Sequence, residues 1–272
     1  TKSNQTAAQT LTAAGKYTIT ITTKDIAGNS STRTQYVYID KTKPTAGTLT
    51  MKLDSSTGSS YLNNTWTNHS VYISLNNGSD ETNGSGHSST TYSISGSATQ
   101  SNQTAAQTLL ATGTYNITVT TKDKAGNTST NNYVIKIDKK APNVGTLTMK
   151  LGSSTGTTYT SGNWTNQSVW LHKNDGSDTL SGHKSTTYTV SGANLTNQTA
   201  DNTISVEGKY TATVTTYDNV YNSSTNSYNV KIDKTAPTTT TPTATSTTNE
   251  ITVTFKQTDS LSGINNSSIQ YA

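Results

Sequence analysis

The stretch "GTYNITVTTKDKAGNTSTNNYVIKID" (residues 113–138) decides the fold of this chain. Tyr115 and Ile117 alternate with polar residues, and Ile135 and Ile137 do the same after a short Gly-Asn turn. Alternation with one apolar face is typical of antiparallel strands whose other face is solvated. Gly supplies the positive φ that a tight turn needs, and Asn tolerates it. The stretch therefore predicts a β-hairpin with one buried face.

The same hairpin sequence occurs three times, and repetition at a fixed period takes precedence over other signals. Tyr17 recurs as Tyr115 and Tyr210, 98 and 95 residues later. A proline follows the last strand of each copy, where it ends the strand and stiffens the junction. The predicted domains are residues 1–41 (the C-terminal part of a repeat), 42–139 and 140–234 (two complete repeats) and 235–272 (the N-terminal part of a further repeat).

The composition favours a β-rich chain. Only 29% of the 272 residues are hydrophobic and 12% are charged, whereas Thr, Tyr, Val and Ile, which suit pleated strands, fill whole stretches. There is no cysteine, so no disulfide stabilises the fold, and no apolar run is long enough for a membrane span. The net charge of +4 comes from scattered basic residues, which excludes a nucleic-acid patch. About seven short strands per repeat predict an all-β chain of tandem immunoglobulin-like antiparallel β-sandwiches, arranged as beads on a string.

Three motifs per repeat carry a family resemblance. Each Gly-x-Tyr, as at Tyr115, has the position of the tyrosine corner of immunoglobulin domains. "WTNQSV" (residues 164–169) is expected to open the second strand, and "DTLSG" (residues 178–182) to form the turn before the third. The motifs resemble bacterial immunoglobulin-like (Big-type) tandem repeats of Gram-positive-type cell-surface proteins over nearly the whole chain. The resemblance implies repeats that usually act as spacers and sometimes as binders.

One copy departs from this pattern. Tyr221 stands where the other copies have Gly28 and Gly126, and this predicts a different turn in the third copy.

The turn at Asp25 has two interpretations, a calcium ligand or a hairpin turn. Calcium takes six to eight oxygen ligands, several of them from carboxylates. Beside Asp25 the sequence offers only Asp40, and the chain has 15 acidic residues in 272. A hairpin turn explains Asp25, Gly28 and Asn29 without an ion. We therefore assign no metal ligand here and expect the melting temperature to move little between excess calcium and chelator.

The sequence predicts no enzyme, no catalytic residue and no cofactor. His87 and His183 occupy equivalent positions, but the fourth copy has Ile264 there. His69 and His172 have no counterpart in other copies, and no Ser-His-Asp or paired-carboxylate arrangement recurs.

Covalent additions are also not expected. Lys52 and Lys150 are equivalent, and their register places them on the solvent side of the first strand, whereas a Lys–Asn cross-link requires a buried lysine. The Asn-x-Ser/Thr triplets, including Asn68 and Asn166, are expected by chance in a chain this rich in Asn, Ser and Thr.

The favoured function is a structural segment of a bacterial extracellular or cell-surface fibre, with other repeats as its partners. One alternative is an adhesin that binds a host glycan or protein, with Tyr72 and Trp170 as stacking platforms, and another is a surface-layer lattice protein. "TKSNQTAAQT" from Thr1 matches "TQSNQTAAQT" from Thr99. Residues 235–272 are therefore expected to pack against residues equivalent to 1–41, of the same long chain or of a neighbour, as in a head-to-tail filament.

Overall fold

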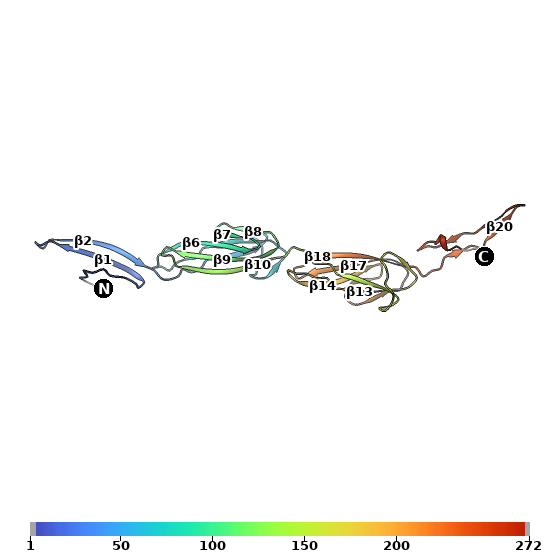
Figure 1. Cartoon of the computed structure of the whole chain (residues 1–272), viewed down its shortest axis with the longest axis horizontal. Helices are drawn as coiled ribbons and strands as arrows, with labels where there is room; N and C mark the ends of the chain where they lie inside the picture. The colour runs from blue at the N-terminus through green and yellow to red at the C-terminus, as the bar shows by residue number, and fades with distance from the viewer. Residues whose placement is uncertain (1–3, 270–272) are drawn as a thin grey trace. The chain divides into compact units, whose positions relative to one another are not determined.

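The structure, a computed structural model, describes residues 4–269 and is all-β. The chain divides into two compact units, residues 1–139 and 140–272 (Figure 1). Within the described residues the only helical element is a 3₁₀ turn at Asn266–Ser268, and no helix there is long and apolar enough to cross a membrane.

The first unit contains a hairpin followed by a complete sandwich. The hairpin pairs β1 (Gly15–Lys24) with β2 (Ser30–Ile39). The sandwich strands are β3 (Thr48–Leu53), β4 (Trp66–Thr67), β5 (Val71–Asn76), β6 (His87–Gly96), β7 (Gln100–Gln103), β8 (Gln107–Leu109), β9 (Gly113–Asp123) and β10 (Thr128–Ile137).

Two sheets form this sandwich, a three-stranded sheet in the order β3-β5-β8 and a five-stranded sheet in the order β4-β10-β9-β6-β7. All pairs are antiparallel except β4 with β10, which is the immunoglobulin-like arrangement. The inward side chains of both sheets, among them Val71, Ile73, Ile117, Val119 and Ile135, form one core. The alternation in the sequence thus becomes the two-layered core that was predicted.

The second unit repeats this topology and ends in a partial repeat. Its complete sandwich consists of β11 (Thr146–Leu151), β12 (Trp164–Thr165), β13 (Val169–Asn174), β14 (His183–Ser191), β15 (Leu195–Gln198), β16 (Asn202–Ile204), β17 (Gly208–Asp218) and β18 (Ser223–Ile232). The partial repeat contains β19 (Thr238–Thr239), β20 (Thr243–Ser246), β21 (Ile251–Thr254) and β22 (Gln257–Thr258). Strand β19 pairs with β22, and β20 pairs with β21.

The predicted tyrosine corner is present in all three copies. The hydroxyl of Tyr115 donates to the carbonyl of Ala111 at 2.9 Å, and Tyr17 and Tyr210 make the same bond four residues back. Tyr115 is buried, and burial raises its pKa. The hydrogen bond satisfies the one polar atom of a side chain that otherwise packs in the core.

Replacing Tyr115 with Phe is expected to lower the unfolding free energy of residues 42–139 by about 0.5–1.5 kcal/mol, the usual net contribution of one hydrogen bond. Urea denaturation of the whole chain measures it. The transition of the second unit serves as the internal control, because Tyr210 is unchanged there. Unaltered stability of the first sandwich would contradict the corner.

Tyr221 does not change its turn, so the expectation of a different turn is wrong. Its φ is 68°, in the same left-handed region as Gly28 and Gly126. Its amide donates to the carbonyl of Asp218 at 3.1 Å, as the Gly126 amide does to Asp123. A non-glycine residue in this region costs about 1–2 kcal/mol. The ammonium of Lys184, 3.4 Å from the centre of the Tyr221 ring, offsets part of that cost.

Candidate metal centre

The Asp-to-Asn turn closes each hairpin as predicted. In the first copy, Oδ1 of Asp25 accepts from the amide of Asn29 and Oδ2 accepts from its Nδ2, both at 2.8 Å. Asp123 and Asn127 make the same two bonds, and the Gly126 amide adds a third at 2.7 Å. The turn sequence is therefore sufficient to fold this loop without an ion.

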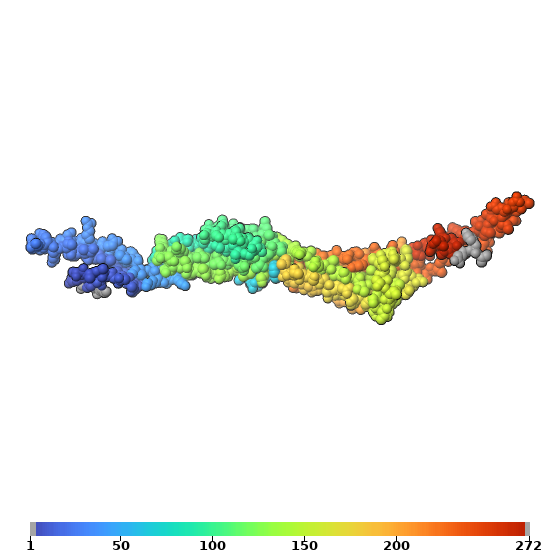
Figure 2. All heavy atoms as spheres, viewed as in Figure 1, coloured from blue at the N-terminus to red at the C-terminus, as the bar shows by residue number. Residues whose placement is uncertain are grey.

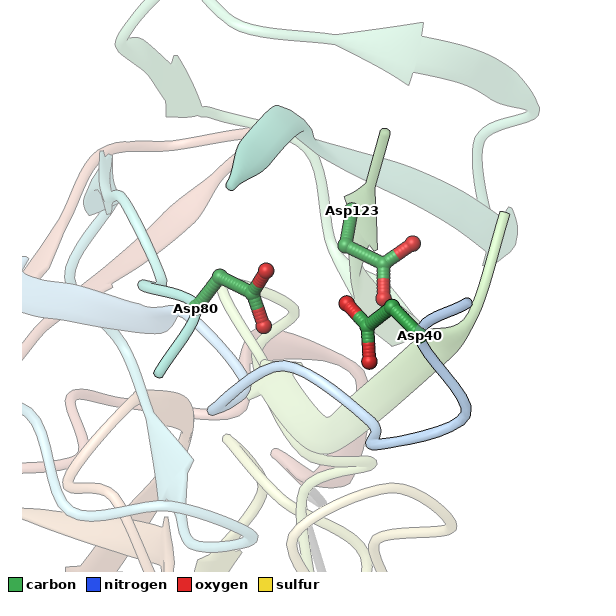
Figure 3. Close-up of side chains that lie close together, drawn as sticks. All are labelled: Asp40, Asp80 and Asp123. Atoms are coloured by element: carbon green, nitrogen blue, oxygen red, sulfur yellow. The ribbon is translucent and has the colours of Figure 1, made fainter. Parts of the chain in front are cut away.

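Asp123 nevertheless lies in a cluster with two further acids. Asp40, at the end of the preceding hairpin, and Asp80, in the loop before β6, each direct a carboxylate toward it (Figure 3). One oxygen from each of the three carboxylates lies within 4.8 Å of the others. Asp123 is completely buried, and the other two are partly buried. We call Asp40, Asp80 and Asp123 the three-aspartate cluster.

Asp40 belongs to the linker, and the following repeat holds it on both sides. Its Oδ2 accepts from the Ser85 amide at 2.7 Å and its Oδ1 from the Thr42 amide at 2.9 Å. The Ser85 hydrogen bonds, followed by that of Thr42, keep the pKa of Asp40 below its usual value. The backbone carbonyl of Asp40 accepts from Nδ2 of Asn127 at 3.2 Å. The carboxylate thus remains charged at neutral pH beside two others.

Asp80 has an unsatisfied oxygen. Its Oδ2 accepts from the Gly86 amide at 2.7 Å, but its Oδ1 is buried and has no hydrogen-bond donor. The adjacent Glu81 carboxyl lowers the pKa of Asp80, and Asp80 raises that of Glu81. A buried carboxylate oxygen without a donor is costly, because it has lost its water and gained no partner.

No ion pair among the described residues involves the cluster. The three ion pairs found in that part of the chain join His69 to Asp54, His172 to Asp201 and Lys173 to Asp175. Like charges this close repel one another, and a bound cation reverses the sign of that interaction.

Calcium suits the spacing of these oxygens. Calcium binds oxygens at about 2.3–2.6 Å, so ligands on opposite sides of the ion lie up to about 5 Å apart. The three oxygens lie within 4.8 Å of one another, which is inside the span of calcium ligands. Three carboxylates supply part of the six to eight oxygens that calcium takes, and water or backbone carbonyls would supply the rest.

The same acids recur in the second unit. Asp218 is completely buried and holds its turn through Asn222, as Asp123 does through Asn127. Asp178 caps the loop before β14 through the amides of Leu180 and Gly182. Further on, Asp233 accepts from the Ser262 amide at 3.0 Å, and the Ser262 hydroxyl donates to Asp259 at 3.5 Å. Asp233 and Asp259 thus occupy the positions of Asp40 and Asp80.

No metal ligand was expected from the sequence, because Asp25 and Asp40 belong to one copy, whereas Asp40 meets the acids of the following copy. The sequence feature that indicates the cluster is the recurrence of aspartates at equivalent positions of successive repeats. An aspartate recurs at three positions of the repeat: 25, 123 and 218; 40, 138 and 233; and 80, 178 and 259.

The other residues weighed from the sequence do not converge on a site. His87 and His183 bond the hydroxyls of Thr90 and Thr186 inside their own sandwiches. Lys52 donates to the carbonyl of Gly58. The remaining two histidines pair with exposed aspartates on the surface, and Lys150 donates to a backbone carbonyl.

Comparisons with known proteins add little. No family profile matches the sequence, and no curated protein matches it. The chain is similar to a solved structure described as "Structures of Clostridium thermocellum CbhA fibronectin(III)-like modules", with 15% identity over 67% of this chain and 93% of that one, and a TM-score of 0.25. A similarity of this strength carries no functional conclusion, and the assignment of immunoglobulin-like sandwiches rests on the strand order described above.

Proposed function

We propose that this chain is a segment of a bacterial extracellular or cell-surface fibre built from tandem Big-type immunoglobulin-like repeats. The supporting observation is that the following repeat holds the linker. Asp40 is bonded through both its carboxylate and its carbonyl, and the hydroxyl of Ser129 donates to the carbonyl of Pro44. A linker held at several points transmits force between repeats, whereas a free tether would first extend.

A cation at the three-aspartate cluster fits this function. It would join the linker residue Asp40 to Asp80 and Asp123 of the repeat that follows. Extracellular fluid contains enough calcium for sites of modest affinity, such as those of extracellular modules with dissociation constants of about 10⁻⁴–10⁻³ M. The proposed role of the ion is to fasten the linker, without taking part in any reaction.

The exposed strand faces also suit a structural role. Pairs of hydroxyl and amide side chains bond across the hairpins, as Thr118 does with Asn132 and Thr213 with Ser227. Such cross-strand pairs stabilise a sheet that faces water on one side. The side chains of these pairs are uncharged, which gives the exposed faces a polar coat.

The adhesin alternative is favoured by one observation. In the second sandwich, the ring of Trp170 lies parallel to that of His172, with 5.6 Å between centroids and 7° between planes. His172 in turn bonds Asp201 at 2.7 Å. The first sandwich has Tyr72 and Ser74 at the two ring positions. The stacked pair is therefore specific to the second sandwich.

A variant that lacks residues 42–139 distinguishes a fibre segment from an adhesin. In a fibre segment, the shortened chain should lose reach in small-angle X-ray scattering and show no saturable binding to a glycan array before or after the deletion. In an adhesin, saturable binding should be found, and Trp170→Ala or Tyr72→Ala should reduce it. A lattice protein would instead form flat sheets in negative-stain micrographs. Saturable binding sensitive to Trp170 would overturn the fibre proposal.

The proposal includes association of the partial repeats. Residues 235–269 supply strands that the hairpin of β1 and β2 lacks, and the next repeat of a long chain or a neighbouring subunit would bring the two together.

A further inference from the structure

The loop between β5 and β6 differs from its counterpart in the second sandwich. It belongs to the first complete sandwich, which is drawn in blue-green to green in Figure 2. Its sequence "DETNGSGH" (residues 80–87) is two residues longer than the equivalent "DTLSGH" (residues 178–183). The longer loop contains the pair Asn83-Gly84, whereas residues 140–234 contain no Asn-Gly pair.

An Asn-Gly pair carries the groups for a reaction within its own backbone. The glycine nitrogen attacks the side-chain carbonyl carbon of the asparagine, ammonia leaves, and a five-membered succinimide ring forms. Water then opens the ring at either carbonyl and gives aspartate or isoaspartate. One water is consumed and one ammonia is released, so no enzyme and no oxidant is needed. Glycine favours the attack because it has no Cβ to hinder a close approach.

The surroundings of Asn83 leave this reaction open. Asn83 is exposed, and its side chain makes no hydrogen bond within the described part of the chain. The Gly84 amide makes one turn hydrogen bond, to the carbonyl of Glu81 at 3.0 Å. A Cβ at Gly84 would meet only side-chain atoms, Oδ2 of Asp80 at 2.7 Å and Cδ and Oε1 of Glu81. An exposed turn held by one such bond opens at little cost.

The other Asn-Gly pair of the sequence, Asn77-Gly78, is locked by comparison. The Gly78 amide donates to the hydroxyl of the buried Thr90 at 3.1 Å. The next residue, Ser79, exchanges two backbone hydrogen bonds with Thr45, at 2.7 and 3.2 Å. A Cβ at Gly78 would lie 2.2 Å from the carbonyl oxygen of Thr45, so backbone packs directly against this glycine. Ring closure at Gly78 therefore requires local opening of the sandwich.

The loop that carries Asn83 also holds the linker. Two residues after Asn83, the Ser85 amide donates to Oδ2 of Asp40 at 2.7 Å, and the Gly86 amide donates to Oδ2 of Asp80 at 2.7 Å. Either product at Asn83 adds a negative charge to this loop. Isoaspartate also lengthens the main chain by one carbon, because the backbone then runs through the former side chain.

We infer that Asn83 is a site of spontaneous deamidation in the folded chain, and that the product is an additional carboxylate in the loop that holds the linker. The inference goes beyond the proposed fibre function and does not depend on it. The first sandwich would change its charge with age at one defined residue.

Peptide mass spectrometry on the folded, full-length chain tests the inference. The chain is kept in mildly alkaline buffer, where a backbone amide loses its proton more readily, and samples are then digested in mild acid. Cleavage after Glu81 places the two asparagines on different peptides. Exchange of the amide nitrogen for oxygen should appear at Asn83 at least about tenfold faster than at Asn77, because only Asn77 must wait for local opening. In denaturing urea the two rates should become similar.

Asn83→Gln is the matched control variant. It keeps an amide at this position but would need a six-membered ring, so reaction at residue 83 should cease while Asn77 behaves as before. Equal rates at Asn77 and Asn83 in the folded chain would overturn the inference. So would an Asn83 that stays unchanged in the folded chain and reacts only in urea.

Discussion

Calcium in hundred-fold excess over its dissociation constant is expected to raise the melting temperature of residues 42–139 by about ten degrees or more. Binding to the folded state alone gives about 2.7 kcal/mol at that excess. A domain of this size shifts by roughly 4–8 °C per kcal/mol. The expectation follows from the three-aspartate cluster, in which one acid is completely buried and one oxygen has no donor. Scanning calorimetry in calcium and in chelator measures the shift.

A matched pair of variants isolates the cluster from the turn. Asp123→Asn removes one ligand charge and one turn carboxylate, and it should abolish the calcium shift of the first sandwich. Asp25→Asn makes the same change in a turn with the same hydrogen bonds to its asparagine, and it should leave that shift unchanged. Equal melting temperatures in calcium and chelator would refute the metal centre and restore the expectation drawn from the sequence.

Truncating Ile117 to Ala is expected to destabilise its sandwich by about 2–5 kcal/mol, the range for large-to-small changes in a core. Ile117 is buried by both sheets, and the cavity left behind cannot be filled from solvent. The loss is large beside a typical domain stability of about 5–15 kcal/mol. Urea denaturation followed by circular dichroism would record it as an earlier transition of the first unit.

Ile19→Ala is the matched control for this change. The two residues occupy the same position of the repeat, but Ile19 is 37% exposed, whereas Ile117 is 1% exposed. The control should therefore cost far less than the core change. Equal costs for the two variants would mean that the hairpin is already covered.

The sequence predicted the β-sandwich correctly, but it did not predict the short strand β12. Alternating residues such as Tyr115 and Ile117 predicted strands, and the strands are present. "WTNQSV" was expected to open the second strand. Instead, Trp164 and Thr165 form β12, which pairs in parallel with β18, and the second strand, β13, begins at Val169. A two-residue strand has no periodicity, so its partner is decided only when the sheet is assembled.

The sequence contains each of these aspartates, but it does not show that they lie close together in the fold. Asp40 lies 83 residues before Asp123, and it belongs to the preceding repeat. Only the path of the linker, fixed by bonds such as that from Ser85 to Asp40, brings the two together. Local turn chemistry explained Asp25 and Asn29 completely, so nothing in that stretch pointed to a more distant partner.

The sharing of aspartates between successive repeats affects how the number of repeats in such a gene can change. Asp40, at the end of one repeat, meets Asp80 and Asp123 of the repeat that follows. Because these positions recur in the following copy, an in-frame duplication or loss of a whole repeat would leave every new junction with the same donor and the same recipients. Unequal recombination between copies could thus lengthen or shorten the protein in a single event, with no compensating mutation at the joint.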